Sequence, residues 1–359
     1  MRPWEMHDTV VIGAGVIGAS IGYHLAARGS AVTVVDAGLP ASGATRHSFA
    51  WISSVGGTDG PAVGLRDLSV QDWRRLGEEI PGLELDWSGA LTWGDEFGRT
   101  EAIDPPIDVE PRLSELPSSA RFSPEEGWID PVRVTEQLIE AARHRGAQIQ
   151  LGAPVVRLIR GEAAGVIGVD LGHVVLGASN VIVAAGTGAA ALCSSVGVSL
   201  PLPSAPAVMV RLAAEPGLIG HIVANDEFEA RQSPDGTILM PRGYAGEDSA
   251  ESLLATGEMA RRLLVDSFEG AEDVRLLGAE IGWRPMTSDG EPAVGVTRIP
   301  GLHVAVAHPG VCLAATIGRL VADEVMTSMP APELARFRPT RFDGPAGRSV
   351  AADDQASTL

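Results

Sequence analysis

TVVIGAGVIGASIGYHLAARGSAVTVVD, residues 9–36, is the stretch that decides the fold. A short apolar strand leads through the glycine-rich turn GAGVIG, residues 13–18, into a helix that is expected to end at Gly29. A second strand, 31–35, then closes on Asp36. The first glycine permits a tight turn, the second lets a pyrophosphate approach the backbone, and the third lets the helix pack closely. The stretch therefore predicts a βαβ unit that binds a dinucleotide, with the acid accepting from ribose hydroxyls.

The composition narrows the classes of function. The 46 acidic and 27 basic side chains among 359 residues give a formal charge of -19, which argues against a nucleic-acid or anionic-membrane partner. All 27 basic residues are Arg and none is Lys. Cys193 and Cys312 form no CxxC or Cys/His cluster, so neither a disulfide framework nor a metal site is expected. No basic, apolar leader and no run of 18 apolar residues occurs, so we expect a cytoplasmic protein without a membrane span.

The remaining segments indicate a discontinuous architecture. A loop rich in Gly, Ser and Thr follows at 37–57, where open α/β sheets bind their ligands. Helices are expected at 71–80, from Pro131 to a stop at Gly146, and over 249–269. Strands are expected in 81–122, after Gly146, at 180–184, from 201 onward with a hairpin turn at 234–236, and before a helix that begins near 310. The segment beyond Met329, rich in Pro, Arg and Ala, is expected to be an arm or disordered. The nucleotide domain is assigned to 1–80, 130–203 and 281–340, the substrate domain to 81–129 and 204–280, and a tail to 341–359.

Four stretches, in this order, resemble the D-amino-acid oxidase and dehydrogenase superfamily of flavoproteins, which includes glycine oxidase and monomeric sarcosine oxidase. They are VVIGAGVIGASIGYHLAARG with VTVVD, SGATRHS, VIVAAGTGA, and GWRPMTSDGEPAVG followed by HPGVCLAATIGRLVADEV. Together they span almost the whole chain. The resemblance implies an α/β fold, with a Rossmann-like FAD-binding domain of the glutathione-reductase type and an inserted α+β substrate domain built on a mixed or antiparallel sheet.

The resemblance also implies how FAD is held. The first glycines hold the pyrophosphate, loop 42–47 the inner phosphate and flavin edge, and Val155, expected in a strand, meets the adenine with its backbone. Residues 310–312 face the flavin N1 and C2 carbonyl, where a helix start stabilises the negative charge of reduced flavin. The expected cofactor-binding residues are Gly13, Gly15, Val16, Ile17, Gly18, Asp36, Ala37, Ser42, Gly43, Ala44, Thr45, Arg46, His47, Val155, Ala185, Gly186, Arg284, Gly310, Val311 and Cys312. Non-covalent FAD is favoured over attachment through Cys312, because a free Cys beside a helix start is more often a small buried hydrophobe.

The substrate residues follow from the same resemblance. Arg284 matches an Arg that grips the substrate carboxylate in several relatives, and a guanidinium gives bidentate, charge-assisted bonds to a carboxylate. The alternative is a structural Arg paired with Asp289 or Glu291. Tyr244 is a candidate for a second contact to the carboxylate. Other candidates are His47 and His308, as catalytic residues that bond to the flavin or tune it, and Trp51 and Trp283, as walls of the pocket.

The function implied is an FAD-dependent oxidoreductase of an amino acid or secondary amine, such as a D-amino acid, glycine, or an N-alkyl or cyclic amino acid. Hydride passes from the carbon beside nitrogen to flavin N5, and the resulting imine hydrolyses. The Lys that promotes the reaction with oxygen in sarcosine-oxidase-like relatives has no counterpart, so oxygen and another electron acceptor stay open. Two alternatives are a non-catalytic or partner-dependent FAD-binding subunit of an amine dehydrogenase, and a flavin monooxygenase.

Overall fold

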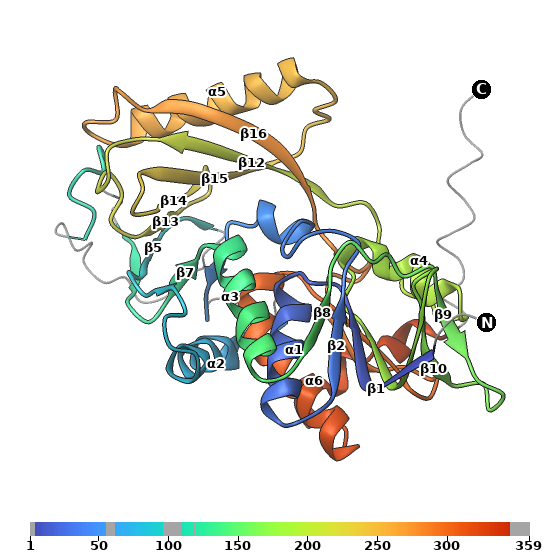
Figure 1. The fold of residues 1–359 in the computed structure, drawn as a ribbon. Coiled ribbons are helices and arrows are strands. Elements are labelled where there is room, and N and C mark those ends of the chain that lie inside the picture. Colours follow the sequence, from blue (N-terminus) through green and yellow to red (C-terminus); the bar gives the residue numbers. More distant parts are fainter. Residues whose placement is uncertain (1–3, 55–61, 96–108, 116, 118, 345–359) are drawn as a thin grey trace, which may run out of the picture.

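A computed structural model describes residues 4–54, 62–95, 109–115, 117 and 119–344. Two large sheets and the helices packed against them make up most of the molecule (Figure 1). The helices are α1 (Val16–Ala27), α2 (Leu65–Glu79), α3 (Pro131–His144), α4 (Ala189–Ser194), α5 (Ala250–Ser267) and α6 (Gly310–Thr327). Short 3-10 turns are η1 (Ala44–His47), η3 (Gly186–Gly188), η4 (Pro332–Phe337) and η5 (Pro339–Phe342).

The first sheet has eight strands and carries the glycine-rich turn. They are β1 (Trp4–Ile12), β2 (Val32–Val35), β8 (Gln148–Gln150), β9 (Arg157–Arg160), β10 (Val166–Asp170), β11 (Val175–Val183), β17 (Ala293–Val296) and β18 (Leu302–Val306). The main path runs β17-β18-β11-β1-β2-β8, and β1 is parallel to both of its neighbours, β2 and β11. β10 pairs with the first part of β11 and β18 with the last part. The chain therefore returns to β1 from far along the sequence to complete this sheet.

Alternating side chains give this sheet two apolar faces. Val11, Val34 and Ile182 point to a core shared with α1, α2, α3 and α6. Val10, Val35 and Val183 point to a second core, on the side of β9, β10 and α4. Both faces of the central strands are thus covered, as expected for parallel strands with continuous apolar sequences.

The second sheet has seven strands and is mostly antiparallel. They are β5 (Ala90–Thr92), β6 (Arg121–Ser123), β12 (Pro206–Ala213), β13 (Ile222–Ala224), β14 (Glu229–Gln232), β15 (Thr237–Gly243) and β16 (Arg275–Trp283), in the order β16-β12-β15-β14-β13-β5-β6. α5 packs on one face, which Figure 1 shows at the side away from the first sheet. A small sheet of β3 (Trp51–Ile52), β7 (Gly127–Ile129) and β4 (Leu85–Asp86) lies beside it. The mixed and antiparallel sheets of the predicted α/β fold are confirmed; the domain boundaries stay a prediction.

Local signals explain where two helices begin. The carboxylate of Asp130 accepts from the backbone N–H of Val132 and of Arg133, each at 2.9 Å, and Pro131 occupies the first turn of α3. Gly146, with φ 97°, follows the end of that helix as predicted. Ser249 forms a capping box with Ser252 at the start of α5.

Three expectations about local structure are wrong. α2 begins at Leu65 rather than at 71, because Leu65 and Ser69 are buried along with the later apolar residues. Val155 lies between β8 and β9, not in a strand. The segment beyond Met329 is not an arm as far as residue 344, since it forms η4 and η5 and buries Leu334 and Phe337. Residues 345–359 lie outside the described part of the chain.

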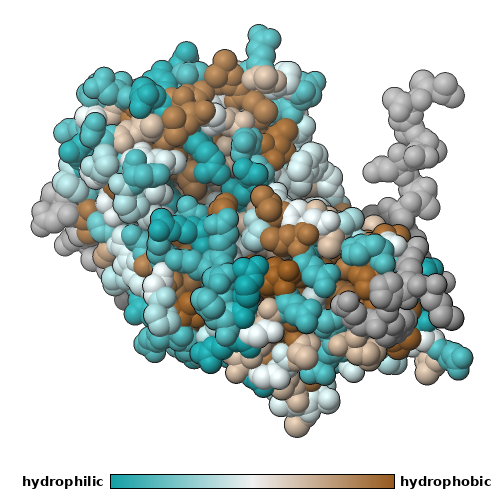
Figure 2. All heavy atoms as spheres, viewed as in Figure 1, coloured by the Kyte–Doolittle hydropathy of each residue, from teal (hydrophilic) through white to brown (hydrophobic). Residues whose placement is uncertain are grey.

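The outer edge of the second sheet is apolar. Figure 2 shows brown side chains near the top of the molecule, where α5 and β16 lie in the same view. Leu254, Met259 and Leu277 are each more than half exposed there. β16 is an edge strand whose pairing with β12 shifts register beside Leu212, and such irregularities discourage edge-to-edge pairing. Among the described helices, none has the length and apolar character needed to cross a bilayer.

Candidate active site

A cavity of about 1530 Å³ lies between the two large sheets. Its walls include the carboxyl ends of β1, β2, β11 and β18 on one side, and parts of β12, β14 and β15 on the other. Ligands of open α/β sheets bind at such strand ends. The volume exceeds the 300–1,000 Å³ or so that is typical of a pocket for one drug-sized ligand, so the cavity has room for a dinucleotide and a second molecule.

Most of the predicted site residues line this cavity. They are Gly13, Gly15, Val16, Ile17, Asp36, Ala37, Ser42, Gly43, Ala44, Thr45, His47, Trp51, Val155, Ala185, Gly186, Trp283, Arg284, His308, Gly310, Val311 and Cys312. Gly18, Arg46 and Tyr244 are not among the lining residues. Tyr244 follows β15 and is 38% exposed, so its position gives no support to a contact with a substrate in this cavity.

The glycine-rich turn owes its shape to two close backbone approaches. Gly13 has φ 112°, and a Cβ built on it would lie 2.3 Å from the carbonyl oxygen of Ala184. A Cβ on Gly18 would lie 1.9 Å from the carbonyl oxygen of Gly13, which explains a packing role away from the cavity. Asp36 accepts from the N–H of Ala14 at 2.6 Å and of Gly38 at 2.7 Å, which fixes its carboxylate at the end of β2. These contacts pre-organise the end of the cavity where the sequence places a ribose and a pyrophosphate.

Loop 42–47 closes over the start of α1. Thr45 Oγ1 accepts from the N–H of Val16 at 3.2 Å, and η1 gives the loop a compact shape. His47 lines the cavity, and its Nδ1 lies 3.5 Å from Glu280 Oε2. Burial lowers the pKa of His47, with the Glu280 carboxylate acting in the opposite direction. The loop therefore brings His47 to the cavity, while Arg46 stays outside the lining.

The start of α6 is held by α2. Ser69 Oγ donates to the carbonyl oxygen of Cys312, and Trp73 Nε1 donates to the same oxygen at 2.9 Å. Both side chains are fully buried. Cys312 Sγ lies 3.3 Å from Ser69 Oγ and 3.3 Å from the carbonyl oxygen of Ser53. No side chain caps the helix, so its first N–H groups and the positive end of its dipole are directed to the cavity that Gly310 lines.

The cavity fits an extended dinucleotide cofactor. A Cβ on Gly43, Gly186 or Gly188 would meet no atom within 4 Å, although all three line the cavity, so their missing side chains leave space for a ligand. α1, like α6, begins without a side-chain cap. Two uncapped helix starts and a carboxylate at the end of β2 suit the phosphates, the ribose and an electron-accepting ring.

Arg284 follows directly after β16 and lines the same cavity as the glycine-rich turn. Its Nε donates to the carbonyl oxygen of Ala205 at 3.2 Å and its Nη2 to that of Pro206 at 3.3 Å. Within the described residues no carboxylate forms an ion pair with it. The alternative partners are occupied, since Asp289 pairs with Arg341 and Glu291 with Arg336. The alternative prediction, that Arg284 forms a structural ion pair with Asp289 or Glu291, is therefore wrong.

His308 shares this basic part of the cavity. Burial, together with the positive charges of Arg284 and Arg66, lowers its pKa to about 4. The imidazole is thus neutral at pH 7 and able to accept a hydrogen bond as well as donate one. Arg66 itself lines the cavity and donates to Ser53 Oγ at 3.3 Å.

Residues 8–324 match the family described as DAO, FAD dependent oxidoreductase. The chain belongs to the DAO family of FAD-dependent oxidoreductases. The match covers the glycine-rich turn, loop 42–47, Arg284 and the start of α6, which are the parts that build the cavity. This DAO-family chain is therefore an enzyme with an α/β fold that depends on FAD.

Individual relatives support this assignment of the DAO-family enzyme. It is 28% identical to a glycine oxidase of Geobacillus kaustophilus, over 95% of this chain and 98% of the relative. The crystal structure of glycine oxidase from Geobacillus kaustophilus superposes with a TM-score of 0.82 and 26% identity, covering 94% of this chain and 99% of that one. A 4-methylaminobutanoate oxidase (formaldehyde-forming) of Paenarthrobacter nicotinovorans is 26% identical over 94% of this chain, which spans 46% of that relative's length.

Several lining residues of the DAO-family enzyme were not predicted from its sequence. Phe49, Ser53 and Arg66 belong to this group. Phe49 and Ser53 flank Trp51 in the predicted ligand-binding loop. Their closeness in sequence to the SGATRHS motif was the one signal that could have identified them. Arg66 lies in the first turn of α2. The sequence predicted that this helix begins later, and no sequence pattern indicated that Arg66 reaches the cavity.

Proposed function

We propose that the enzyme oxidises the C–N bond of an amine that carries a carboxylate, namely an amino acid or a secondary amine. The observation that carries the proposal is Arg284, a cavity-lining guanidinium without a carboxylate partner among the described residues, in an FAD-dependent family. A substrate carboxylate would complete its charge-assisted bonds. The relatives named for glycine and 4-methylaminobutanoate oxidation support the same class of substrate.

The cofactor is FAD, bound without a covalent link. The glycine-rich turn and Asp36 would hold its pyrophosphate and ribose, and Gly310, Val311 and Cys312 would present their N–H groups to its ring. When bound, FAD accepts a hydride from the carbon beside the substrate nitrogen. Cys312 supports non-covalent binding, because its Sγ is enclosed by Ser69 and Ser53 in a 1% exposed position.

The chain's own residues orient the substrate and keep its environment dry. Arg284 fixes the carboxylate, and Phe49 and Trp51 provide an apolar wall beside it. Because His308 is neutral, it can accept a hydrogen bond from the amine, and the nearby positive charges favour the amine's unprotonated form. Positioning and electrostatics thus supply the catalysis that these side chains offer.

The electron acceptor is oxygen or another electron acceptor. None of the 359 residues is Lys, so a Lys cannot provide the positive charge that promotes the reaction with oxygen. Arg284, Arg66 and Arg242 line the cavity and are available for that role. A cytoplasmic setting is supported by two buried cysteines, Cys193 and Cys312, that are free thiols. The formal charge of -19 supports the absence of a nucleic-acid partner.

The test is the visible spectrum of the purified holoenzyme, mixed without air with D-amino acids, glycine, and N-methylated and cyclic amino acids, and with matching amines that lack the carboxylate. We expect one class to bleach the flavin, and the speed at which colour returns in air separates an oxidase from a dehydrogenase. A colourless protein, or a flavin that only amines without a carboxylate bleach, would contradict the proposal. A flavin that none of them bleaches would favour the partner-dependent alternative.

A further inference from the structure

Arg231, on β14, is a buried cation behind the cavity wall. It is 1% exposed. Its Nε donates to the carbonyl oxygen of Phe49 at 2.7 Å, its Nη2 to that of Ile129 at 3.2 Å, and its Nη1 to Ser233 Oγ at 3.3 Å. Its Cζ lies 4.1 Å from the ring centroid of Trp128 and 5.7 Å from that of Phe49.

The charge of Arg231 has no direct ion-pair partner. No carboxylate among the described residues forms an ion pair with it, whereas buried Arg side chains are almost always paired. The carboxylates of Asp130 and Asp86 stabilise the charge from a longer distance, and Arg211 opposes them. Burial lowers the pKa of Arg231 to about 9, so the guanidinium is still charged at neutral pH. An unpaired buried charge costs stability, and main-chain carbonyls and two aromatic rings offset only part of that cost. A cation retained under these conditions calls for a role beyond packing.

The position of Arg231 suggests that role. Phe49, Ala50 and Trp51 line the cavity, but Arg231 itself does not. Arg231 therefore lies behind the wall, in contact with the ring of Phe49. The other end of that wall is held by Glu126, which accepts from Trp51 Nε1 at 2.8 Å and from the N–H of Ser54 at 3.2 Å.

We propose that Arg231 is a positioning residue whose buried guanidinium fixes the Phe49–Trp51 wall and adds positive potential to the cavity, favouring a carboxylate ligand. The inference rests on the proposed function, from which it takes the carboxylate. In general, at an effective dielectric constant of about 20, a unit charge within about 10 Å of a bound carboxylate changes its binding constant by roughly tenfold or more. An apolar wall between them keeps water from screening the interaction.

The test compares two probes of the same shape, propionate and propionamide. Their dissociation constants are measured from the change in the visible spectrum of the holoenzyme. The variants are Arg231→Met, which removes the charge, and Arg231→Lys, which keeps it but loses the planar fork. The control is Arg275→Met, which removes the same charge from an exposed position on β16 of the same sheet.

We expect Arg231→Met to weaken propionate about tenfold or more and propionamide less than about threefold. Arg231→Lys should weaken each probe less than about threefold, and Arg275→Met should weaken neither. Equal losses of both probes in Arg231→Met would show a merely structural residue, and unchanged propionate binding would also overturn the inference. If the wild-type enzyme binds no propionate, the proposed function fails together with the inference. If the wild type binds propionate and only the Arg231 expectations fail, the inference alone is overturned.

Arg231→Lys keeps the inference testable if Arg231→Met does not fold. A Lys loses its proton at a pH about two units below that of an Arg in the same setting. Propionate binding by Arg231→Lys should therefore weaken at a lower pH than in the wild type, while propionamide binding stays level. Identical pH profiles for propionate in the two proteins would overturn the inference.

Discussion

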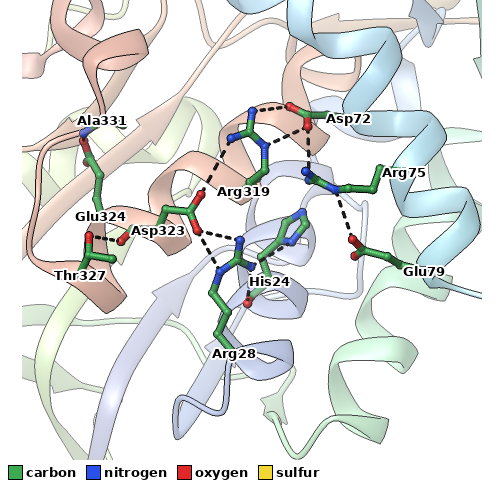
Figure 3. Close-up of polar contacts among 10 residues, drawn as sticks. All are labelled: His24, Arg28, Asp72, Arg75, Glu79, Arg319, Asp323, Glu324, Thr327 and Ala331. Carbon is green, nitrogen blue, oxygen red and sulfur yellow. Dashed lines mark hydrogen bonds and ion pairs between the residues drawn. The ribbon is translucent and has the colours of Figure 1, made fainter.

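Arg319 of α6 and Asp72 of α2 form a two-pronged ion pair, with Nε 2.9 Å from Oδ1 and Nη2 2.9 Å from Oδ2. Figure 3 shows that this pair belongs to a larger network. Asp72 also contacts Arg75, and Asp323 joins Arg319 to Arg28 of α1. The network ties together the three helices α1, α2 and α6, and the first turn of each lines the cavity. We therefore expect the network to support both stability and cofactor retention.

Asp72→Asn tests the pair directly. The side chains of Asp72 and Arg319 are 7% and 19% exposed, so the loss leaves a poorly solvated guanidinium. We expect the free energy of unfolding to fall by roughly 2–3 kcal/mol, somewhat less than for a fully buried pair because Asp323 stays near Arg319. Urea denaturation followed by circular dichroism measures the change.

The matched control for Asp72→Asn is Glu140→Gln. It breaks the Arg143–Glu140 pair, whose side chains are 52% and 49% exposed. We expect a loss below about 0.5 kcal/mol, because solvent screens an exposed pair. Equal effects of the two substitutions would show that the Arg319–Asp72 pair adds nothing beyond a surface contact.

His24 makes the fold sensitive to acid. Burial, together with the positive charges of Arg28, Arg75 and Arg319, lowers its pKa to about 3. Between pH 6.5 and pH 3 the unfolded chain binds a proton at this site that the folded chain does not, so stability falls as the pH falls. This site should cost about 2 kcal/mol between pH 7.5 and pH 5. Urea titrations of the wild type and of His24→Gln at both pH values measure the difference.

His144→Gln serves as the control for that titration. The side chain of His144 is 76% exposed, so its removal should leave the acid sensitivity unchanged. His24→Gln should lose stability less steeply than the wild type over the same range. If the free energy of unfolding of His24→Gln falls with pH as steeply as that of the wild type, other groups cause the acid sensitivity.

Gly15→Val should abolish FAD retention. Gly15 lines the cavity at the uncapped start of α1, and a Val side chain would occupy the place of the pyrophosphate. The ratio of flavin to protein absorbance in the purified variant is the measurement. Gly278→Val is the control, because a Cβ at Gly278 meets no atom within 4 Å and this glycine lies outside the cavity lining. Full flavin content in Gly15→Val would contradict the placement of the phosphates.

Arg284→Met should raise the KM for a carboxylate substrate while the flavin stays bound. Loss of a charge-assisted, bidentate contact corresponds to about 2 kcal/mol or more, or roughly 30-fold or more in kcat/KM. Steady-state kinetics with the substrate that bleaches the flavin provide the measurement. Arg242→Met, which removes another cavity-lining Arg, should have a smaller effect. Equal effects would mean that the cavity needs positive charge but no dedicated carboxylate site.

The dinucleotide end of the site was readable from sequence because its constraints are local. The contact between Gly18 and Gly13 lies within one βαβ unit, although the atom that a side chain on Gly13 would meet first belongs to Ala184, after β11. The composition of that unit therefore specifies its shape. The family and the FAD dependence followed from the resemblance of four stretches taken together, and the family match confirms both.

The substrate end was less predictable, because distant segments build it. The nearness of Asp289 to Arg284 in sequence suggested an ion pair between them. In the structure, Asp289 pairs instead with Arg341, from the segment after Met329. Tyr244 looked suitable by type, but the end of β15 leaves it outside the lining. Arg231 sits in the polar sequence EFEARQS, and only its packing against Trp128 and Phe49 removes it from water.

The strand order of the first sheet has a consequence for biosynthesis. β1 obtains one neighbour from β2 within its own unit, but β11 and β18 are added much later along the chain. Contacts of such long sequence separation form slowly and late. A ribosome must also have made residues 310–312 before the second helix start can meet a ligand. We therefore expect the nascent chain to emerge with an unfinished nucleotide site and to take up its flavin only near the end of translation or after release.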